Sequence, residues 1–231
     1  RPGIAPQDED PHAVICCASP PCFMHELDPS WLGLPAWREV RAWRKAERKT
    51  LIAQRLAVPA EERARRDRDI TARLRAAVPD LKHRHVGFYW PFKGEYDPRT
   101  LARALHDDGA QLALPVVVEK GRPLQFRPWR PGMRMVPGVW NIPVPADGPA
   151  VAPDVLLVPL VGFDAGGYRL GYGGGYYDRS LAAMAPRPLA IGVGFEISRL
   201  ATIHPQPHDI PMDVIVTERA AIRIHAEERT T

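Results

Sequence analysis

Short apolar segments alternate along this chain with stretches of helical periodicity, and this alternation restricts the possible folds more than any other feature. Strand-like runs stand at residues 85–90, 111–118, 124–127, 154–164, 189–194, 214–217 and 221–224. Helical patterns stand at residues 35–58, 60–78, 98–108, 175–184 and 198–203. We therefore expect an α/β fold with three layers, in which helices cover both faces of a mostly parallel sheet. An irregular N-terminal extension (residues 1–35) is expected to precede one domain (residues 36–231).

The composition fits one soluble globular domain, because 231 residues with 45% apolar and 25% charged side chains can bury one sizeable core. Cys16, Cys17 and Cys22 all fall in the first 22 residues, which argues against a secreted fold held by disulfides. No apolar run approaches the roughly 20 residues that span a bilayer. Acidic residues 8–10 stand where a signal peptide would be basic. We expect a cytoplasmic protein without a membrane partner.

A glycine-rich loop follows the apolar run at residues 154–164, and its sequence is Arg-Leu-Gly-Tyr-Gly-Gly-Gly-Tyr-Tyr-Asp (residues 169–178). Glycine has no Cβ, so it allows positive φ angles and close approach of the backbone to a ligand. Successive N–H groups in such a loop can bind an anion. The loop fits neither the Walker pattern nor the dinucleotide fingerprint, and many glycine-rich stretches are only turns. The loop alone indicates a phosphate site without naming a reaction.

Three loops should meet at the carboxyl ends of the strands, where α/β sheets bind their ligands. They follow Trp90, follow Phe163 and precede Asp213. Trp90 is typical of a core aromatic as well as of a stacking platform, and Glu95 on its own reads as a solvated loop acid. On the first helix, Arg44 and Arg48 share one face beside Lys45, an arrangement that suits an anionic ligand and equally an ordinary solvated surface.

Asp178 and Asp213 are the candidates for metal binding. Together with nucleotide phosphates, two carboxylates would supply the oxygen ligands that Mg²⁺ prefers. Asp178 has a second interpretation as an acid in the first turn of a helix, where the helix dipole favours it. His204, His208 and Asp209 are metal-ligand types in a proline-rich loop, but a zinc site is not expected there.

The segment 159–178, with its glycine loop, resembles the signature of the 5-formyltetrahydrofolate cyclo-ligase family, also called 5,10-methenyltetrahydrofolate synthetases. Further motifs follow the family's order and spacing over about residues 37–225, namely residues 44–48 ahead of 59–63, 93–95, 141–145, and 208–209 followed by Asp213.

The resemblance implies an ATP- and Mg²⁺-dependent ring closure. In that family, ATP phosphorylates the formyl oxygen of 5-formyltetrahydrofolate, N10 of the folate attacks the activated carbon, and phosphate leaves to give 5,10-methenyltetrahydrofolate and ADP. Such chemistry requires mainly positioning and neutralisation of charge. The implied partners are ATP and a reduced folate, and the implied assembly is a monomer or homodimer.

The resemblance also assigns residues to each ligand. Arg44 stands where the family often has Lys, and Trp90 is bulkier than the aliphatic residue sometimes found at its position. The implied ATP-binding residues are Arg44, Lys45, Arg48, Arg169, Leu170, Gly171, Tyr172, Gly173, Gly174, Gly175, Tyr176 and Tyr177. The implied folate-binding residues are Trp90, Glu95, Tyr172, Gly173, Gly174, Gly175 and Tyr176. The implied Mg²⁺ ligands are Asp178 and Asp213.

Two other functions compete with this interpretation. A paralogue with the same ATP cleft could act on another N-formyl or pterin-like substrate. A non-catalytic protein could instead use the basic residues between Arg38 and Arg75 to follow the phosphates of a nucleic acid. Acidic residues are interleaved with that basic segment, which is typical of a solvated helix face, so nucleic acid is not expected as a partner.

Overall fold

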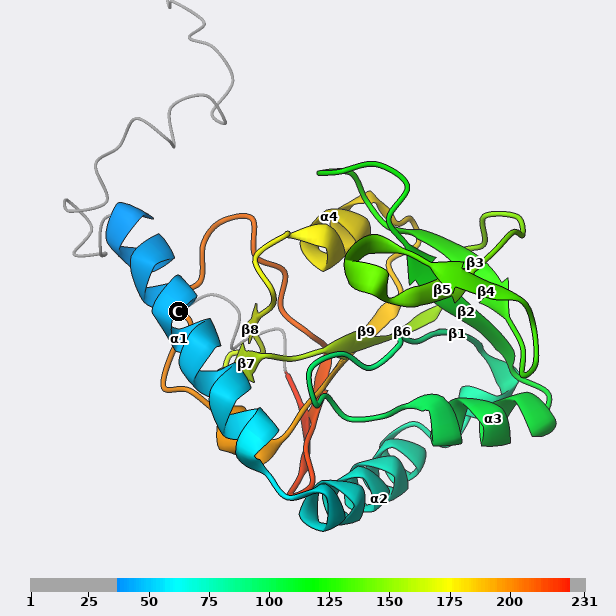
Figure 1. Ribbon diagram of the computed structural model, residues 1–231, viewed down its shortest axis with the longest axis horizontal. Helices are drawn as coiled ribbons and strands as arrows, with labels where there is room; N and C mark the ends of the chain where they lie inside the picture. The colour runs from blue at the N-terminus through cyan, green and yellow to red at the C-terminus, as the bar shows by residue number, and fades with distance from the viewer. Residues whose placement is uncertain (1–36, 225–231) are drawn as a thin grey trace, which may run out of the picture. The chain divides into compact units, whose positions relative to one another are not determined.

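The computed structural model describes residues 37–224 of the chain. The chain divides into two compact units between Arg41 and Ala42, and of the first unit only residues 37–41, the start of helix α1 (Trp37–Ala57), are described. The predicted N-terminal extension and its three cysteines lie outside the described residues. The second unit contains the sheet and every residue predicted to bind a ligand (Figure 1).

A seven-stranded sheet forms the centre of the second unit, in the spatial order β11-β10-β9-β6-β1-β2-β3. The five middle strands are parallel, whereas β3 and β11 pair antiparallel with their neighbours at the edges. The predicted α/β fold with a mostly parallel sheet is confirmed. The strands of this sheet are β1 (His85–Gly87), β2 (Gln111–Val116), β3 (Gln125–Trp129), β6 (Val155–Pro159), β9 (Leu189–Val193), β10 (Val214–Val216) and β11 (Ala221–Arg223).

The direction in which the sheet grows reverses between β1 and β6. From β1 the chain passes through helix α3 (Arg99–Asp107) to β2 on one side, and from β6 it passes through helix α4 (Tyr176–Ala183) to β9 on the other side. The loops that leave the carboxyl ends of β1 and β6 therefore diverge to opposite faces of the sheet. Such a switch point is where open α/β sheets leave a crevice for a ligand.

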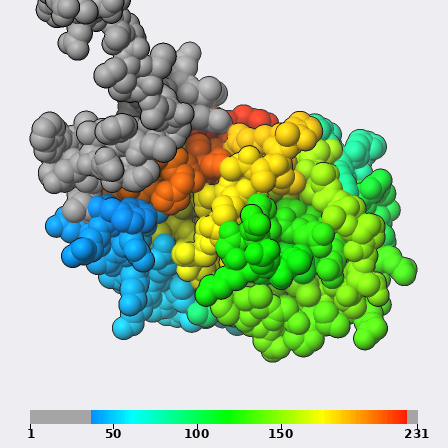
Figure 2. All heavy atoms as spheres, turned by 90° about the horizontal axis from the view of Figure 1, so that it is seen from above, coloured from blue at the N-terminus to red at the C-terminus, as the bar shows by residue number. Residues whose placement is uncertain are grey.

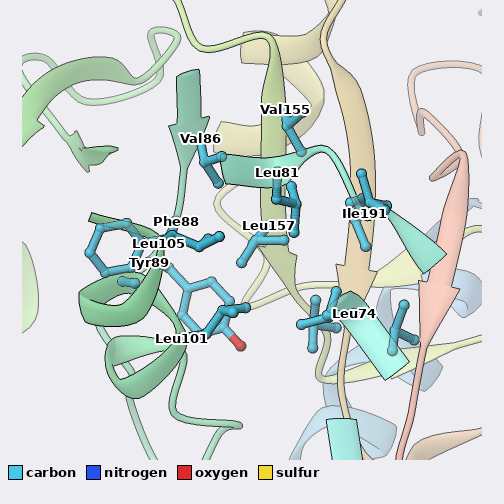
Figure 3. Close-up of a cluster of buried hydrophobic side chains, with 14 of the residues drawn as sticks. Leu74, Leu81, Val86, Phe88, Tyr89, Leu101, Leu105, Val155, Leu157 and Ile191 are labelled. Atoms are coloured by element: carbon cyan, nitrogen blue, oxygen red, sulfur yellow. The ribbon is translucent and has the colours of Figure 1, made fainter. Parts of the chain in front are cut away.

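Helices cover both faces of the sheet, with α2 (Ala60–Ala77) and α3 on one side and α4 on the other (Figure 1). On the first side, Leu74 of α2 and Leu101 of α3 pack against Val86, Leu157 and Ile191 of the strands (Figure 3). Burial of each such side chain contributes about 1.5–3 kcal/mol, so this cluster fixes the carboxyl end of β1 firmly.

The opposite face of the sheet is covered by α4, whose Leu181 packs with Leu156 and Phe163. Figure 2 views this side, where yellow atoms of α4 lie beside green atoms of the chain between β2 and β6. A hydrogen bond of 2.8 Å from Leu124 N to Ser180 Oγ joins these two segments. Both faces of the sheet are thus covered, as the near-continuous apolar strands predict.

Two small antiparallel ribbons stand outside the main sheet. The proline-rich connection before β6 contains β4 (Met135–Pro137) and β5 (Pro143–Pro145), joined through the 3-10 turn η4 (Val139–Asn141). After β6, β7 (Gly162–Phe163) pairs with β8 (Arg169–Leu170), and this hairpin delivers the chain into the glycine-rich loop. The hairpin packs against α1 through Leu51, Val161 and Leu170.

Most predicted helices form, but the helix expected at residues 198–203 does not. Only the 3-10 turn η5 (Glu196–Ser198) is present there. Another short 3-10 turn, η3 (Leu81–His83), precedes β1. The backbone N–H of Leu200 instead donates to Phe163 O, and that of Ile203 donates to the carboxylate of Asp164. Long-range hydrogen bonds to the β7 region therefore override the local helical pattern. None of the helices in residues 37–224 combines the length and apolar character needed to cross a bilayer.

Candidate active site

Glu95 lies in the loop that follows β1, at the switch point of the sheet. Its side chain is only 6% exposed. The backbone N–H of Phe92 donates to Oε2 at 2.8 Å, and the hydroxyl of Tyr172, from the glycine-rich loop, donates to Oε1 at 2.8 Å. The solvated acid that the residue suggests on its own is therefore wrong, because the fold buries Glu95 between two loops that are 77 positions apart in sequence.

The loop that carries Glu95 is tied to the core by two tyrosines. The hydroxyl of Tyr89 donates to Tyr96 O at 3.1 Å, and the hydroxyl of Tyr96 lies 2.8 Å from Thr71 Oγ1 on α2. Lys93 and Gly94 turn the chain with positive φ angles of 48° and 74°. These tethers hold the carboxylate in one position, which is a requirement for selective recognition of a ligand.

Burial dominates the electrostatics of Glu95. Loss of water raises the pKa of its carboxyl group to about 7, while the charge of Arg55 and the hydrogen bonds from Tyr172 and Phe92 lower it in part. No ion pair joins Glu95 to a cation in the part of the chain that the structure describes. A carboxylate buried with neutral donors can still accept hydrogen bonds from an incoming ligand, since each oxygen can accept more than one.

Three aromatic side chains gather beside this carboxylate. The ring of Phe92 is nearly parallel to that of Trp140, at 6.2 Å between centroids, and Tyr172 meets both rings at 5.7 and 6.1 Å. Trp140 is 56% exposed although it is large and apolar, and its backbone has a φ of 57°. Flat apolar faces next to a hydrogen-bonding group are typical of a site for a planar heterocycle. Neither Phe92 nor Trp140 is among the site residues predicted from the sequence.

Trp90, the aromatic residue that was predicted to bind folate, occupies a different environment. It is partly buried against the main core, and the guanidinium of Arg99 lies 5.0 Å from the centre of its ring. A cation over an indole face is a favourable contact. The structure therefore places Trp90 in the same loop region as Glu95 but gives its ring a partner from α3.

Within the glycine-rich loop, residues 171–175 link β8 to α4 and contact α1. Gly173 has a φ of 92°, a conformation that other residues rarely adopt, and a Cβ atom there would lie 3.4 Å from the guanidinium of Arg48. Nε of Arg48 donates to Gly171 O at 2.6 Å. The fold therefore brings Arg48, Tyr172 and Gly173 together, with Gly173 and Gly174 exposed to solvent.

The three predicted cations of α1 differ in their surroundings. Arg44 is buried and donates to Ile203 O, His204 O and the carboxylate of Asp209, which lies 2.5 Å away. Lys45 is exposed. Arg48 is half-buried, and burial together with the charge of Arg44 lowers its pKa. Arg44 therefore anchors the loop before Asp209, while Arg48 faces the glycine-rich loop.

The remaining predicted ATP residues surround the start of α4. Leu170 is buried in a cluster with α1, whereas Tyr176 packs its ring under Gly174. The guanidinium of Arg169 lies 5.8 Å from the centre of the ring of Tyr177. Arg179, which is not among the residues predicted from the sequence, donates to Gly174 O and holds the other side of the loop.

Asp178 and Asp213, the predicted Mg²⁺ ligands, each pair with an arginine. Both oxygens of Asp178 accept hydrogen bonds from Arg169, at 3.1 and 3.0 Å, and Oδ1 also accepts one from Ile210 N. Asp213 accepts from Arg187 at 3.0 Å and from Ala190 N at 2.8 Å, at the amino ends of β9 and β10. Within residues 37–224, no three or more His, Cys, Asp or Glu side chains group in a way that could hold a metal ion.

Arg55 is the least expected member of this region. It is 4% exposed on α1, and it donates to Lys93 O, Leu160 O and the hydroxyl of Tyr172. The sequence holds a signal that could have identified it, because position 55 follows the apolar Leu51 by one helical turn on the core-facing side. An arginine at such a position needs buried acceptors, and the two loops of the candidate site supply them.

Comparison with known proteins identifies the family of this chain. The family model of the 5-formyltetrahydrofolate cyclo-ligases matches residues 40–218. The 5-formyltetrahydrofolate cyclo-ligase of Mycolicibacterium smegmatis is 33% identical over 76% of this chain and 93% of its own length, and that of Escherichia coli K12 is 30% identical over 71% and 94%.

Two solved structures extend the likeness to the fold. The 5,10-methenyltetrahydrofolate synthetase of Aquifex aeolicus superposes with a TM-score of 0.69 at 31% identity, covering 78% of this chain and 92% of that one. The synthetase of Mycoplasma pneumoniae superposes with a TM-score of 0.63 over 76% and 98%, and at 23% identity it supports the fold alone. From its sequence, its fold and its glycine-rich loop, this chain belongs to the 5-formyltetrahydrofolate cyclo-ligase family.

Proposed function

We propose that this chain is an ATP-dependent ligase that converts 5-formyltetrahydrofolate into 5,10-methenyltetrahydrofolate, with release of ADP and phosphate. Its relatives carry the name of that activity. The observation that supports the proposal best is the buried carboxylate of Glu95, which stands at the switch point of the sheet and is hydrogen-bonded to the glycine-rich loop. That arrangement brings a site for a hydrogen-bonding heterocycle next to a site for phosphate.

The pterin ring of the folate would bind at Glu95. Its ring amide N–H and exocyclic amine form a pair of adjacent donors, and the Glu95 oxygens can each accept one beyond the bond they accept from the protein. Phe92 and Trp140 offer flat faces beside the carboxylate. Trp90 is retained as a folate-binding residue through its place in the same loop region, and Gly173 to Tyr176 would border the folate from the other side.

ATP would bind along the glycine-rich loop, with its phosphates facing Arg48. Arg48 contacts the loop backbone at Gly171, and Lys45 stands exposed on the neighbouring helix surface. Arg44 would serve this subsite through its ion pair with Asp209. Positive side chains and oriented backbone N–H groups stabilise the charge that spreads over a phosphoryl group during transfer.

The reaction requires the chain to hold the formyl oxygen of the folate in line with the γ-phosphorus of ATP. The formyl oxygen of the folate attacks the γ-phosphorus, and the bond from phosphorus to the bridging oxygen breaks to release ADP. The lone pair of N10 then attacks the activated formyl carbon, its proton is lost, and the carbon–oxygen bond breaks to release phosphate. The buried Glu95 loop and the glycine-rich loop would fix the distance between formyl group and phosphate, which is where most of the rate enhancement of such a reaction arises.

Magnesium would enter this site with ATP, as part of the substrate complex. The residues of the described chain do not form a resident magnesium centre, because Asp178 and Asp213 have arginine partners and no larger group of ligand side chains surrounds them. Mg²⁺ commonly keeps several waters and binds through substrate phosphates with one or two carboxylates. Asp178 and Asp213 remain predicted ligands, and each would exchange an arginine for the metal, but Asp213 stands at the amino ends of β9 and β10, on the sheet edge opposite the loop of Glu95.

The test is an absorbance assay for 5,10-methenyltetrahydrofolate in the purified chain, with 5-formyltetrahydrofolate and with or without Mg-ATP. We expect product only when both substrates are present. A folded sample that binds ATP and forms no product would refute the activity and favour the paralogue with another substrate. A salt-sensitive shift of RNA in a gel without nucleotide turnover would favour the nucleic-acid binder.

A further inference from the structure

Among residues 37–224, no acidic side chain forms an ion pair with the buried cation Arg55. Its Nε donates to Lys93 O at 3.0 Å, one terminal nitrogen donates to Leu160 O at 3.1 Å, and the other donates to the hydroxyl of Tyr172 at 2.7 Å. All three acceptors are neutral. A buried guanidinium with only neutral acceptors is costly unless an opposite charge lies close by, so its retention here calls for a reason.

An opposite charge that acts on Arg55 is Glu95, which is separated from it by one hydroxyl group. Arginine can only donate, so the Tyr172 oxygen must accept from Arg55 and its single proton is left for another acceptor. Glu95 Oε1 lies 2.8 Å away, whereas Phe92 O is a weaker alternative at 3.4 Å. The hydrogen bonds therefore run from Arg55 to Tyr172 and from Tyr172 to Glu95, and the proton of Tyr172 points at the carboxylate.

This chain of hydrogen bonds orients the carboxylate. Tyr172 occupies one side of Oε1 and the Phe92 N–H occupies one side of Oε2, so the remaining acceptor positions of both oxygens face away from these donors. Arg55 also holds the carbonyl of Lys93, two residues before Glu95, and that of Leu160, ahead of the β7–β8 hairpin. One side chain thus fixes both the acid and the two chain segments that flank it.

We infer that Arg55 is a positioning residue for folate, which acts through the Tyr172 hydroxyl to hold Glu95 as an oriented, ionised acceptor. The inference rests on the proposed function, since it concerns how that same site recognises its substrate. Arg55 is not required to touch either substrate. Its loss should therefore weaken folate binding and leave ATP binding nearly intact.

The pH dependence of folate KM separates this role from a merely structural one. The groups that face Glu95 are Arg55 from α1, Tyr172 from the glycine-rich loop, Tyr89 after β1 and Tyr177 from α4, with Lys93 two positions away in its own loop. Burial raises the pKa values of the three tyrosines, so they stay neutral near pH 7. Arg55 is then the charge whose removal changes the ionisation of Glu95.

The experiment compares Arg55→Gln, Arg55→Lys and Tyr172→Phe with the unaltered chain, and folate KM is measured between pH 5.5 and 9 at saturating ATP. We expect Arg55→Gln to move the pH midpoint of folate KM upward by about one unit and to raise folate KM about tenfold at neutral pH. Tyr172→Phe should move the midpoint in the same direction, and Arg55→Lys, which keeps the charge, should move it least. ATP KM should change less than about threefold.

Lys49→Met is the matched control, because it removes one positive charge from an exposed position on the same helix. It should leave the midpoint unchanged. In a Glu95→Gln background, Arg55→Gln should lose most of its effect on folate KM, since coupled residues are not additive.

An unchanged midpoint in Arg55→Gln that still folds and turns over would overturn the inference. If Arg55→Gln does not fold, an unchanged midpoint in both Tyr172→Phe and Arg55→Lys would overturn it equally. Either result leaves the unaltered chain active, whereas failure of the proposed function would appear as an absence of product in the unaltered chain itself.

Discussion

Glu95 and Asp178 are two acids that the fold removes largely from water, and it compensates them in opposite ways. The Asp178 side chain is 18% exposed, and Arg169 donates to both of its oxygens. Glu95 is more deeply buried but accepts only from a backbone N–H and a tyrosine hydroxyl, with Arg55 one residue further away. One carboxylate is neutralised by direct contact, and the other is left short of donors.

This difference in hydrogen-bond partners indicates which acid is suited to bind a ligand. An acid that is already paired with arginine gains little from a new donor, because it would have to give up a charged hydrogen bond. An acid buried among neutral donors is held in a costly state that a ligand with suitable N–H groups can relieve. The second pattern, at Glu95, is the one expected where a pterin binds, while Asp178 joins β8 to α4.

Glu95→Gln should have the largest effect of the variants considered. An amide presents an N–H where the pterin needs an acceptor, so kcat/KM for the folate should fall about 10³-fold. ATP KM should stay within about threefold, because Glu95 is assigned to the folate side of the site. Steady-state kinetics with each substrate varied in turn measures both values. A variant with unaltered folate KM would show that Glu95 has only a structural role.

Asp178→Asn should mainly affect stability. It leaves Arg169 buried without its counter-ion, which should lower the free energy of unfolding by about 3 kcal/mol. Urea denaturation measures this loss, and Asp213→Asn serves as the comparison, because its partner Arg187 is more exposed and the loss should be smaller.

The same variant also examines the metal assignment. If Asp178 is a Mg²⁺ ligand during turnover, Asp178→Asn should raise the Mg²⁺ concentration needed for half-maximal activity at constant ATP. If its role is only the ion pair with Arg169, stability should fall while that concentration stays unchanged. The Mg²⁺ titration thus decides whether Asp178 differs from Glu95 in function as it does in its surroundings.

The pH dependence of stability should reveal the strain at Glu95. The pKa of Glu95 is raised from 4.5 to about 7 in the folded chain. The stabilisation that its protonated carboxyl group gives to the folded state is therefore fully present below pH 4.5 and is lost as the pH rises through 7. Relative to Glu95→Gln, the unaltered chain should lose about 2 kcal/mol of unfolding free energy between pH 5 and pH 8. Urea denaturation at both pH values gives the difference, and an equal gap at both would contradict the raised pKa.

Arg48→Met should give the smallest effect, on the phosphate side of the comparison. It removes the cation that contacts the glycine-rich loop, so ATP KM should rise about tenfold. Lys45→Met provides the control on the exposed neighbouring position and should raise ATP KM less. Equal effects of the two variants would mean that ATP is held by general positive charge rather than by the loop contact of Arg48.

The fold could be predicted from the sequence, and so could the loops that form the candidate site. Apolar runs mark buried strands directly, and a glycine-rich loop after such a run marks a place where backbone approaches a ligand. Long-range contacts could not be predicted in this way. The pattern at residues 198–203 is helical, yet hydrogen bonds to Phe163 and Asp164 determine its structure.

Individual site residues depended on the same kind of contact. The hydroxyl that donates to the buried Glu95 lies 77 positions away in the sequence, and the role of Arg55 becomes interpretable only when its three acceptors are seen. Trp140 lies in a proline-rich connection whose path over the site no local pattern encodes. Residue type and spacing therefore located the loops, while the partners of each side chain had to come from the fold.

Proton release on folate binding tests the central claim most directly. If a pterin binds to ionised Glu95 and the pKa of the free carboxyl group is about 7, binding at pH 6.5 should release roughly three quarters of a proton. Calorimetric titration of 5-formyltetrahydrofolate in two buffers of different ionisation enthalpy measures this number. The account predicts that release in the unaltered chain and none in Glu95→Gln. Folate binding without proton release at pH 6.5 in the unaltered chain would contradict it.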